Sequence, residues 1–149
     1  MYHPEWKYGI LISNFAEQSV ITKALPGWTI GYRGCNEVSI GSYGPWFAGS
    51  CKTLKKACSV YGCQGLELDC PIVVFGGEYI RQNDKWVSRG SKYDSDVRKG
   101  NYKDPDKIVE NNFRVLLTRA RKEMILLILN DPVLDETYQY FIDMKMDIL

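Results

Sequence analysis

The sequence predicts an α/β fold in a single domain, residues 1–149, built on a mostly parallel sheet flanked by helices. The length of 149 residues suits one domain of ordinary size, and 45% hydrophobic residues are enough to form a core. Short apolar runs alternate along the chain with segments of helical spacing, which is typical of parallel sheets covered by helices. The nearly continuous apolar run Pro71–Phe75 fits a central parallel strand that is buried on both faces.

The first half of the chain predicts a strand, a helix, an irregular region and a second helix. YGILIS at Tyr8–Ser13 is a short apolar run with β-branched members, which favours a strand. Residues 15–25 have helical spacing, and Pro26–Gly27 ends that helix. Trp28–Ser50 is rich in glycine and aromatic residues, which indicates an ordered loop or short strands. The stretch CKTLKKACSV, residues 51–60, predicts a short helix whose solvent-facing side carries Lys52, Lys55 and Lys56.

The second half predicts a helix, a strand and a helix after a polar insertion. Residues 77–106 are charged and rich in glycine and aspartate, as in a long surface loop or insertion. DPDKIVENNFRVLLTRARK at residues 104–122 has a broad apolar stripe and predicts a helix, with Asp104 or Asp106 as its cap. MILLILN and then DPVLDETYQYFIDMKM, residues 124–146, predict a buried strand and a closing helix.

The overall charge of the chain is nearly neutral. A net charge of +1 with 25% charged residues creates no strong field toward nucleic acid or a membrane, so an acidic partner must bind a local patch. No apolar run approaches the roughly 20 residues that span a bilayer. The N-terminal stretch MYHPEWKYG lacks the basic and then apolar segments of a signal peptide. We therefore expect a cytoplasmic protein with no membrane partner.

The cysteines do not form a metal-binding pattern. There is no C-x-x-C pair, and His3 is the only histidine. A structural zinc site normally takes four ligands with short paired spacings. We therefore expect no bound metal, and instead reduced thiols that are mostly buried as small apolar side chains: Cys35, Cys51, Cys58, Cys63 and Cys70.

The stretch TRAR ends a predicted helix directly before a predicted strand. Arg119 and Arg121 can there simply offset the negative end of the helix dipole, which is worth about 0.3–1 kcal/mol. The alternative is a guanidinium that contacts a transferring phosphate, since such an arginine finger accelerates hydrolysis by about 10³–10⁵-fold. The residues alone leave both interpretations open.

The stretch QGLELD lies before the strongest predicted strand. Gly65 allows a sharp turn or a close approach of the backbone to a ligand. Gln64 and Glu67 can hydrogen-bond a sugar or a water molecule. A loop with ordinary solvated polar side chains accounts for the same residues.

Together and in this order, the two stretches resemble motifs V and VI of superfamily 1 helicases. More narrowly, CQGLELDCPIVVFGGEYI and NNFRVLLTRARKEM resemble the C-terminal part of a family of uncharacterised DNA/RNA helicases defined by a domain of unknown function, which is related to the Schlafen helicase region. The resemblance extends over about Tyr8–Tyr140 and is specific at Cys63–Glu78 and Asn111–Lys122. It implies that the chain is the second RecA-like domain of a helicase, with a P-loop NTPase-like fold.

The resemblance also implies a role for each matching residue. In these helicases ATP lies between two RecA-like domains, and the second domain supplies motifs V and VI. Arg119 would be the catalytic arginine finger on the γ-phosphate, with Arg114 as a weaker candidate. Further nucleotide-binding residues would line the cleft or support the finger: Gln64, Gly65, Glu67, Thr118 and Arg121.

The parts of an ATP site that hold phosphates and magnesium are missing from the sequence. No stretch matches G-x-x-x-x-G-K-[ST], and Lys52, which follows the Gly-rich region, is preceded by Cys51 and not by glycine. No Walker-type D-E pair follows a strand in the right place, and NFAEQ after the first strand lacks the arginine often found in motif IV. The resemblance therefore implies that an N-terminal P-loop domain of the same protein is a partner. ATP and Mg²⁺ would bind only in the complete two-domain protein, and this chain alone would be inactive.

Two other functions fit parts of the sequence. One is a stand-alone nucleic-acid-binding module with a degenerate RecA-like fold, which would bind single-stranded DNA or RNA through aromatic rings and lysines. Its surface would comprise Trp28, Trp46, Phe47, Lys52, Lys55 and Lys56, although large rings are more commonly used in cores. The other is a nuclease with a divalent metal held by clustered acids, drawn from Glu67, Asp69, Glu78, Asp94 and Asp96.

Overall fold

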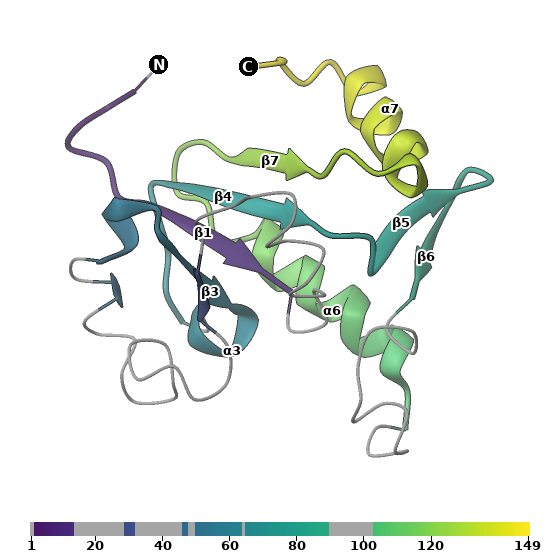
Figure 1. Ribbon diagram of the computed structural model, residues 1–149, viewed down its shortest axis with the longest axis horizontal. Coiled ribbons are helices and arrows are strands. Elements are labelled where there is room, and N and C mark those ends of the chain that lie inside the picture. The colour runs from purple at the N-terminus through teal and green to yellow at the C-terminus, as the bar shows by residue number, and fades with distance from the viewer. Residues whose placement is uncertain (1, 14–28, 32–45, 48–49, 64, 90–102) are drawn as a thin grey trace.

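Five parallel strands form the central sheet of the computed structural model, in the order β2-β3-β1-β4-β7. They are β1 (Tyr8–Ile12), β2 (Thr29–Gly31), β3 (Lys56–Ser59), β4 (Cys70–Phe75) and β7 (Ile125–Ile128). The neighbours β3, β1, β4 and β7 are labelled in Figure 1. Every neighbouring pair in this sheet is parallel. The prediction of an α/β fold with a mostly parallel sheet is confirmed, and the arrangement fits a RecA-like half-domain.

The structure describes residues 2–13, 29–31, 46–47, 50–63, 65–89 and 103–149. The helix predicted at residues 15–25, most of the irregular region after it, and Gln64 lie outside the described residues.

β1 and β4 are the central strands because both are apolar along almost their whole length. Ile10, Leu11 and Ile12 of β1 are completely buried, as are Val73 and Val74 of β4. A strand that is covered on both faces and paired on both edges has no position for a solvated side chain, which is why such strands are continuous apolar runs. Both strands were predicted from that pattern.

The two C-terminal helices also form where the sequence predicts them. α6 (Pro105–Leu117) begins at Asp104, whose side chain accepts a hydrogen bond from the Lys107 N–H at 3.0 Å. α6 ends at Leu117, before Arg119 and Arg121, so the two arginines lie in a loop and not on the helix. The chain closes with a 3₁₀ turn, η2 (Pro132–Leu134), and α7 (Asp135–Asp143).

The segment predicted as a polar insertion begins with a β-hairpin. β5 (Tyr79–Gln82) and β6 (Lys85–Ser88) pair in antiparallel fashion across a two-residue turn, Asn83–Asp84, in which both residues have positive φ (51° and 60°). The hairpin lies beside α7 (Figure 1), and the Arg81 N–H donates to the Thr137 hydroxyl at 2.8 Å. The long-surface-loop alternative is therefore wrong for residues 79–88, whereas the insertion at residues 77–106 stays a prediction. Residues 90–102 lie outside the described part of the chain.

The predicted helix at residues 51–60 is also wrong. A 3₁₀ turn, η1 (Ser50–Thr53), is followed by Leu54 with φ of +54°, by β3, and by the one-turn helix α3 (Val60–Cys63). β3 pairs with β1 on one edge and with β2 on the other. Pairing within the sheet outweighs the local helical preference of this lysine-rich stretch. No helix within the described residues is long and apolar enough to cross a membrane.

Candidate functional site

The two motif-like stretches lie side by side at the amino ends of β4 and β7. Leu68 and Ala120 form a parallel bridge. The Leu68 N–H donates to the Arg119 carbonyl at 3.0 Å, and the Arg121 N–H donates to the Leu68 carbonyl at 2.8 Å. Residues 118–124, here called the arginine loop, are thereby attached to the segment that leads into β4. The fold thus brings together stretches that are distant in the sequence.

Arg119 is half-buried, and neutral oxygen atoms hold its guanidinium. Nε donates to the Val115 carbonyl at 3.0 Å, and Nη1 lies 3.4 Å from the Leu66 carbonyl. Nη2 lies 3.4 Å from the Thr118 hydroxyl oxygen. Among the described residues, no carboxylate lies within ion-pair distance of Arg119. The side chain is therefore oriented, and no carboxylate of the described residues neutralises its positive charge.

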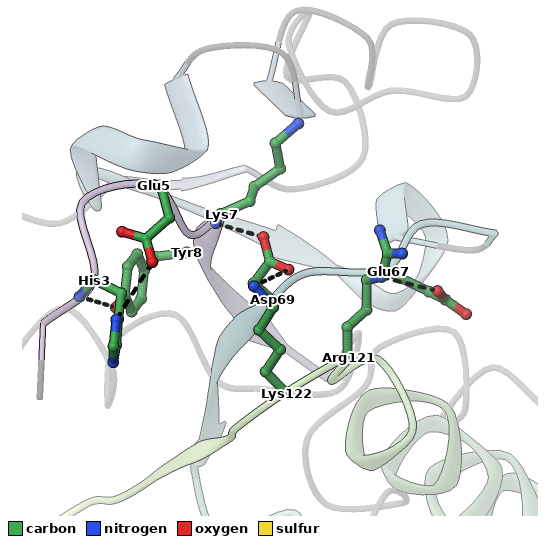
Figure 2. A network of polar contacts seen from close by, with 8 residues as sticks. All are labelled: His3, Glu5, Lys7, Tyr8, Glu67, Asp69, Arg121 and Lys122. Carbon is green, nitrogen blue, oxygen red and sulfur yellow. Dashed lines mark hydrogen bonds and ion pairs between the residues drawn. The ribbon is translucent and has the colours of Figure 1, made fainter.

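The other two cations of the arginine loop have carboxylate partners (Figure 2). Arg121 Nε lies 3.7 Å from Glu67 Oε2, with both side chains mostly exposed. Lys122 Nζ lies 3.6 Å from Asp69 Oδ1. Within the described part of the chain, Arg121 and Lys122 therefore have carboxylate partners and Arg119 has none.

Asp69 joins the arginine loop to the start of β1. Its Oδ2 accepts a hydrogen bond from the Lys7 N–H at 2.9 Å (Figure 2), and its carbonyl accepts from the Lys122 and Glu123 N–H groups, each at 3.1 Å. The Lys7 hydrogen bond is the main cause that lowers the pKa of Asp69, and the charges of Lys122 and Arg121 lower it further. The sequence shows Asp69 only as one of several acids, so its bridging position was not predicted.

The segment before β1 is folded back through ring stacking. The rings of His3 and Trp6 stack with centroids 4.0 Å apart, and those of Tyr2 and Tyr8 stack at 5.5 Å. Lys122 Nζ lies 4.8 Å from the centroid of the Trp6 ring, at cation–π distance. Lys122 therefore contacts both Asp69 and the N-terminal aromatic residues.

The remaining predicted nucleotide-site residues, apart from Gln64, lie in the two segments that the Leu68–Ala120 bridge joins. Gly65 is exposed and has φ of +76°, a left-handed conformation that suits glycine. Glu67 is exposed and pairs with Arg121. The hydroxyl of Thr118 lies 3.0 Å from the Arg114 and Val115 carbonyls, so it caps the end of α6.

The structure describes the predicted aromatic and lysine surface only in part, because Trp28 lies outside the described residues. Trp46 is completely buried, and its Nε1 donates to the Lys56 carbonyl at 3.2 Å, so its ring has no face open to a base. Lys7 Nζ lies 3.7 Å from the centroid of the Phe47 ring. Lys52 and Lys55 are exposed, but Lys56 is half-buried at the start of β3. We therefore leave Trp46 out of any proposed binding surface.

The acids and thiols do not form a metal centre in the described part of the chain, where no group of three or more His, Cys, Asp or Glu residues could hold a metal ion. Glu78 follows β4 at the opposite end from Glu67 and Asp69, and burial raises its pKa to about 7. Burial likewise raises the pKa of the Cys58 thiol, and that of Cys63 to about 11. The described cysteines are free and buried, as predicted: Cys51, Cys58, Cys63 and Cys70.

Comparison with known protein families identifies the kind of domain to which this site belongs. Residues 39–130 match the family model for the Schlafen group 3, DNA/RNA helicase domain. The chain belongs to this family. The matched range includes both motif-like stretches, β3, β4, α6 and β7, so the site lies within a helicase-related domain. No curated protein and no solved structure matches the chain.

Proposed function

We propose that this Schlafen group 3 helicase domain is the C-terminal motor half of an ATP-dependent DNA or RNA helicase. The chain supplies the motif V residues and the motif VI arginine finger, Arg119, to an ATP site that an N-terminal P-loop domain of the same protein completes. The observation that carries the proposal is the guanidinium of Arg119, which neutral acceptors orient and which has no carboxylate partner among the described residues.

An oriented cation without an anionic partner is suited to stabilise charge on a ligand. A half-buried charge is costly unless it is paired, so folding alone favours a carboxylate beside Arg119. An arginine has five N–H donors, and the described residues supply three acceptors to Arg119, so donors remain for a phosphoryl oxygen within this part of the structure. Preorganised donors of this kind supply most of the catalysis in phosphoryl transfer. Arg121 and Lys122 are less suited, because each already has a carboxylate partner.

The other residues have supporting roles in the same site. Thr118 holds Arg119 at the end of α6, while Gly65 and Glu67 line the nucleotide side together with Gln64. Arg121 supports the finger or contacts the P-loop domain. The triphosphate and Mg²⁺ are held by the P-loop domain, since this chain lacks the residues that cradle them. The chain therefore does not hydrolyse ATP alone.

The test uses a two-domain protein that contains this chain. We expect Arg119→Ala to slow single-turnover ATP hydrolysis by about 10³-fold or more while nucleotide affinity stays within a few-fold, because the finger acts in the transition state. Lys103→Ala is the control, since Lys103 is an exposed cation before α6 that has no assigned role in the site. Unchanged turnover in Arg119→Ala would refute the assignment.

A further inference from the structure

We propose that Asp69 is a positioning residue for Arg119, and that it couples the arginine loop to the N-terminal segment Tyr2–Tyr8. The proposal rests on the proposed function, because it concerns how the same phosphate-contacting guanidinium is held and what senses its occupancy.

Asp69 connects three segments of the chain, since it leads directly into one and is hydrogen-bonded to the other two. It lies directly before β4, its side chain accepts the Lys7 N–H at 2.9 Å, and its carbonyl accepts the Lys122 and Glu123 N–H groups at 3.1 Å. The Cys70 N–H donates to the Lys7 carbonyl at 3.2 Å, which closes the contact between the two strand starts. Asp69 is therefore the point at which β1, β4 and the arginine loop meet.

The position of the arginine loop determines where the Arg119 guanidinium lies. The backbone bonds of Leu68 and Asp69 hold residues 119–123 in register with the segment before β4. The guanidinium then reaches the Leu66 carbonyl in that segment at 3.4 Å, while Nε remains on the Val115 carbonyl of α6. A displacement of about 1 Å at a reacting group can cost about 10²-fold in rate. Loss of the Asp69 side chain would loosen one side of this arrangement.

The N-terminal segment is linked to the same loop through Lys122. The ammonium of Lys122 lies 3.6 Å from Asp69 Oδ1 and 4.8 Å from the centroid of the Trp6 ring (Figure 2 shows Lys122 reaching toward Asp69). An anion that binds Arg119 and also attracts the neighbouring cations changes the relative strength of the two contacts of Lys122, with Asp69 and with Trp6. The indole of Trp6 thus reports on the arginine loop, and the carboxylate of Asp69 transmits the change.

The first experiment follows side-chain NMR signals of this chain within a two-domain protein, where the P-loop domain can hold a triphosphate, during titration with inorganic tripolyphosphate. In the wild type we expect the Arg119 Nε–H signal and the Trp6 indole signal to shift with the same midpoint. In Asp69→Asn, which keeps the size and one acceptor oxygen, the Arg119 signal should still shift while the Trp6 shift falls several-fold. Asp147→Asn, at an exposed position near the C-terminus, is the matched control and should behave as the wild type.

The outcomes separate the two proposals. A Trp6 shift in Asp69→Asn as large as in the wild type overturns the coupling, and so does a wild type in which Arg119 shifts without Trp6. Absence of any Arg119 shift counts against the proposed function instead. If Asp69→Asn does not fold, Lys122→Met tests the same link, because it removes the cation beside Trp6 and leaves the Lys7 hydrogen bond to Asp69 intact.

The second experiment tests positioning in a two-domain protein. Asp69→Asn should slow hydrolysis by about 10- to 100-fold with KM for ATP within about twofold, because misplacement of the finger affects the transition state and not ground-state binding. Asp69→Glu keeps the charge and should recover most of the rate. An unchanged rate in Asp69→Asn, or loss of rate and affinity together, would contradict a positioning role.

Discussion

The two ends of the parallel sheet differ in whether they favour the charged or the neutral form of a carboxyl group. At the amino ends of β4 and β7, Asp69 is partly exposed and bonded to Lys7 and Lys122. At the carboxyl end of β4, Glu78 is completely buried, and neither carboxylate oxygen has a hydrogen-bond partner of good geometry in the described residues. Asp69 is therefore favoured as a charged group and Glu78 as a neutral one, and the charge of the site is concentrated at the amino end.

This contrast predicts opposite pH dependences for the free energy of unfolding. The pKa of Glu78 is raised by burial to about 7, although the Ser13 hydroxyl and nearby backbone N–H groups partly favour its charged form. The pKa of Asp69 is lowered by its partners. Stability should therefore fall toward acid pH through Asp69 and fall toward neutral pH through Glu78, with a maximum at mildly acidic pH.

The largest expected effect on stability is that of Glu78→Gln. The unfolded carboxyl titrates near 4.3, so between roughly pH 4.3 and pH 7 the folded state retains a proton that the unfolded state has lost, and stability falls by about 1.4 kcal/mol per pH unit. The amide does not titrate, so the variant does not lose stability over this range. The free energy of unfolding of the variant minus that of the wild type should therefore be roughly 3 kcal/mol larger at pH 8 than at pH 4.

Urea unfolding at half-unit steps from pH 4 to pH 8 measures this difference. Glu136→Gln, at an exposed position in the first turn of α7, serves as the control and should leave the slope unchanged. Parallel stability curves for Glu78→Gln and the wild type would mean that Glu78 is not the group that titrates.

A smaller effect is expected from Gly9→Ala, which tests how tightly the amino end is packed. A Cβ at Gly9 would lie 2.9 Å from Leu68 Cδ1 and 2.9 Å from Trp46 Cη2, both in fully buried side chains. Such overpacking costs about 1–3 kcal/mol, measured as a lower urea midpoint. If the crowding against Leu68 is the cause, the same substitution should cost less in a Leu68→Ala background. Equal costs in the two backgrounds would exclude that contact.

The smallest expected effect is the loss of stability at acid pH that arises from protonation of Asp69. Its lowered pKa gives stability that is present above the unfolded value of about 3.9 and is lost as the pH falls through the folded value. Asp69→Asn should therefore make stability less steep below about pH 4, as followed by circular dichroism during acid titration. Asp147→Asn should keep the wild-type curve, and an Asp69→Asn curve identical to it would show that the Asp69 pairings add nothing to stability.

The elements that could be predicted from sequence are those whose pattern is local. β1 and β4 are continuous apolar runs, and α6 carries its own cap at Asp104 beside a buried stripe. β3 could not be predicted, because KACS forms a strand only through pairing with β1 and β2. The β5–β6 hairpin was missed because its turn is Asn-Asp and not the stronger Asn-Gly signal.

In the candidate site too, residues within a sequence motif could be predicted, whereas contacts between residues far apart in the chain could not. Motif order in the sequence indicated Arg119 and Glu67, and the family match supports a helicase-related domain. Asp69 was not recognised as a bridging residue, because its partners Lys7 and Lys122 are distant from it along the chain. Trp46 was placed on a possible surface because composition alone does not distinguish a buried ring from an exposed one.

β7 is the last strand on its side of the sheet, and this affects the loop that precedes it. The arginine loop is attached through Leu68 and Asp69 to one neighbouring segment, while the opposite flank of β7 has no strand beside it in the described sheet. A change in the segment before β4 is therefore expected to displace the arginine loop and Arg119 with it, because β7 has no second neighbouring strand among the described residues.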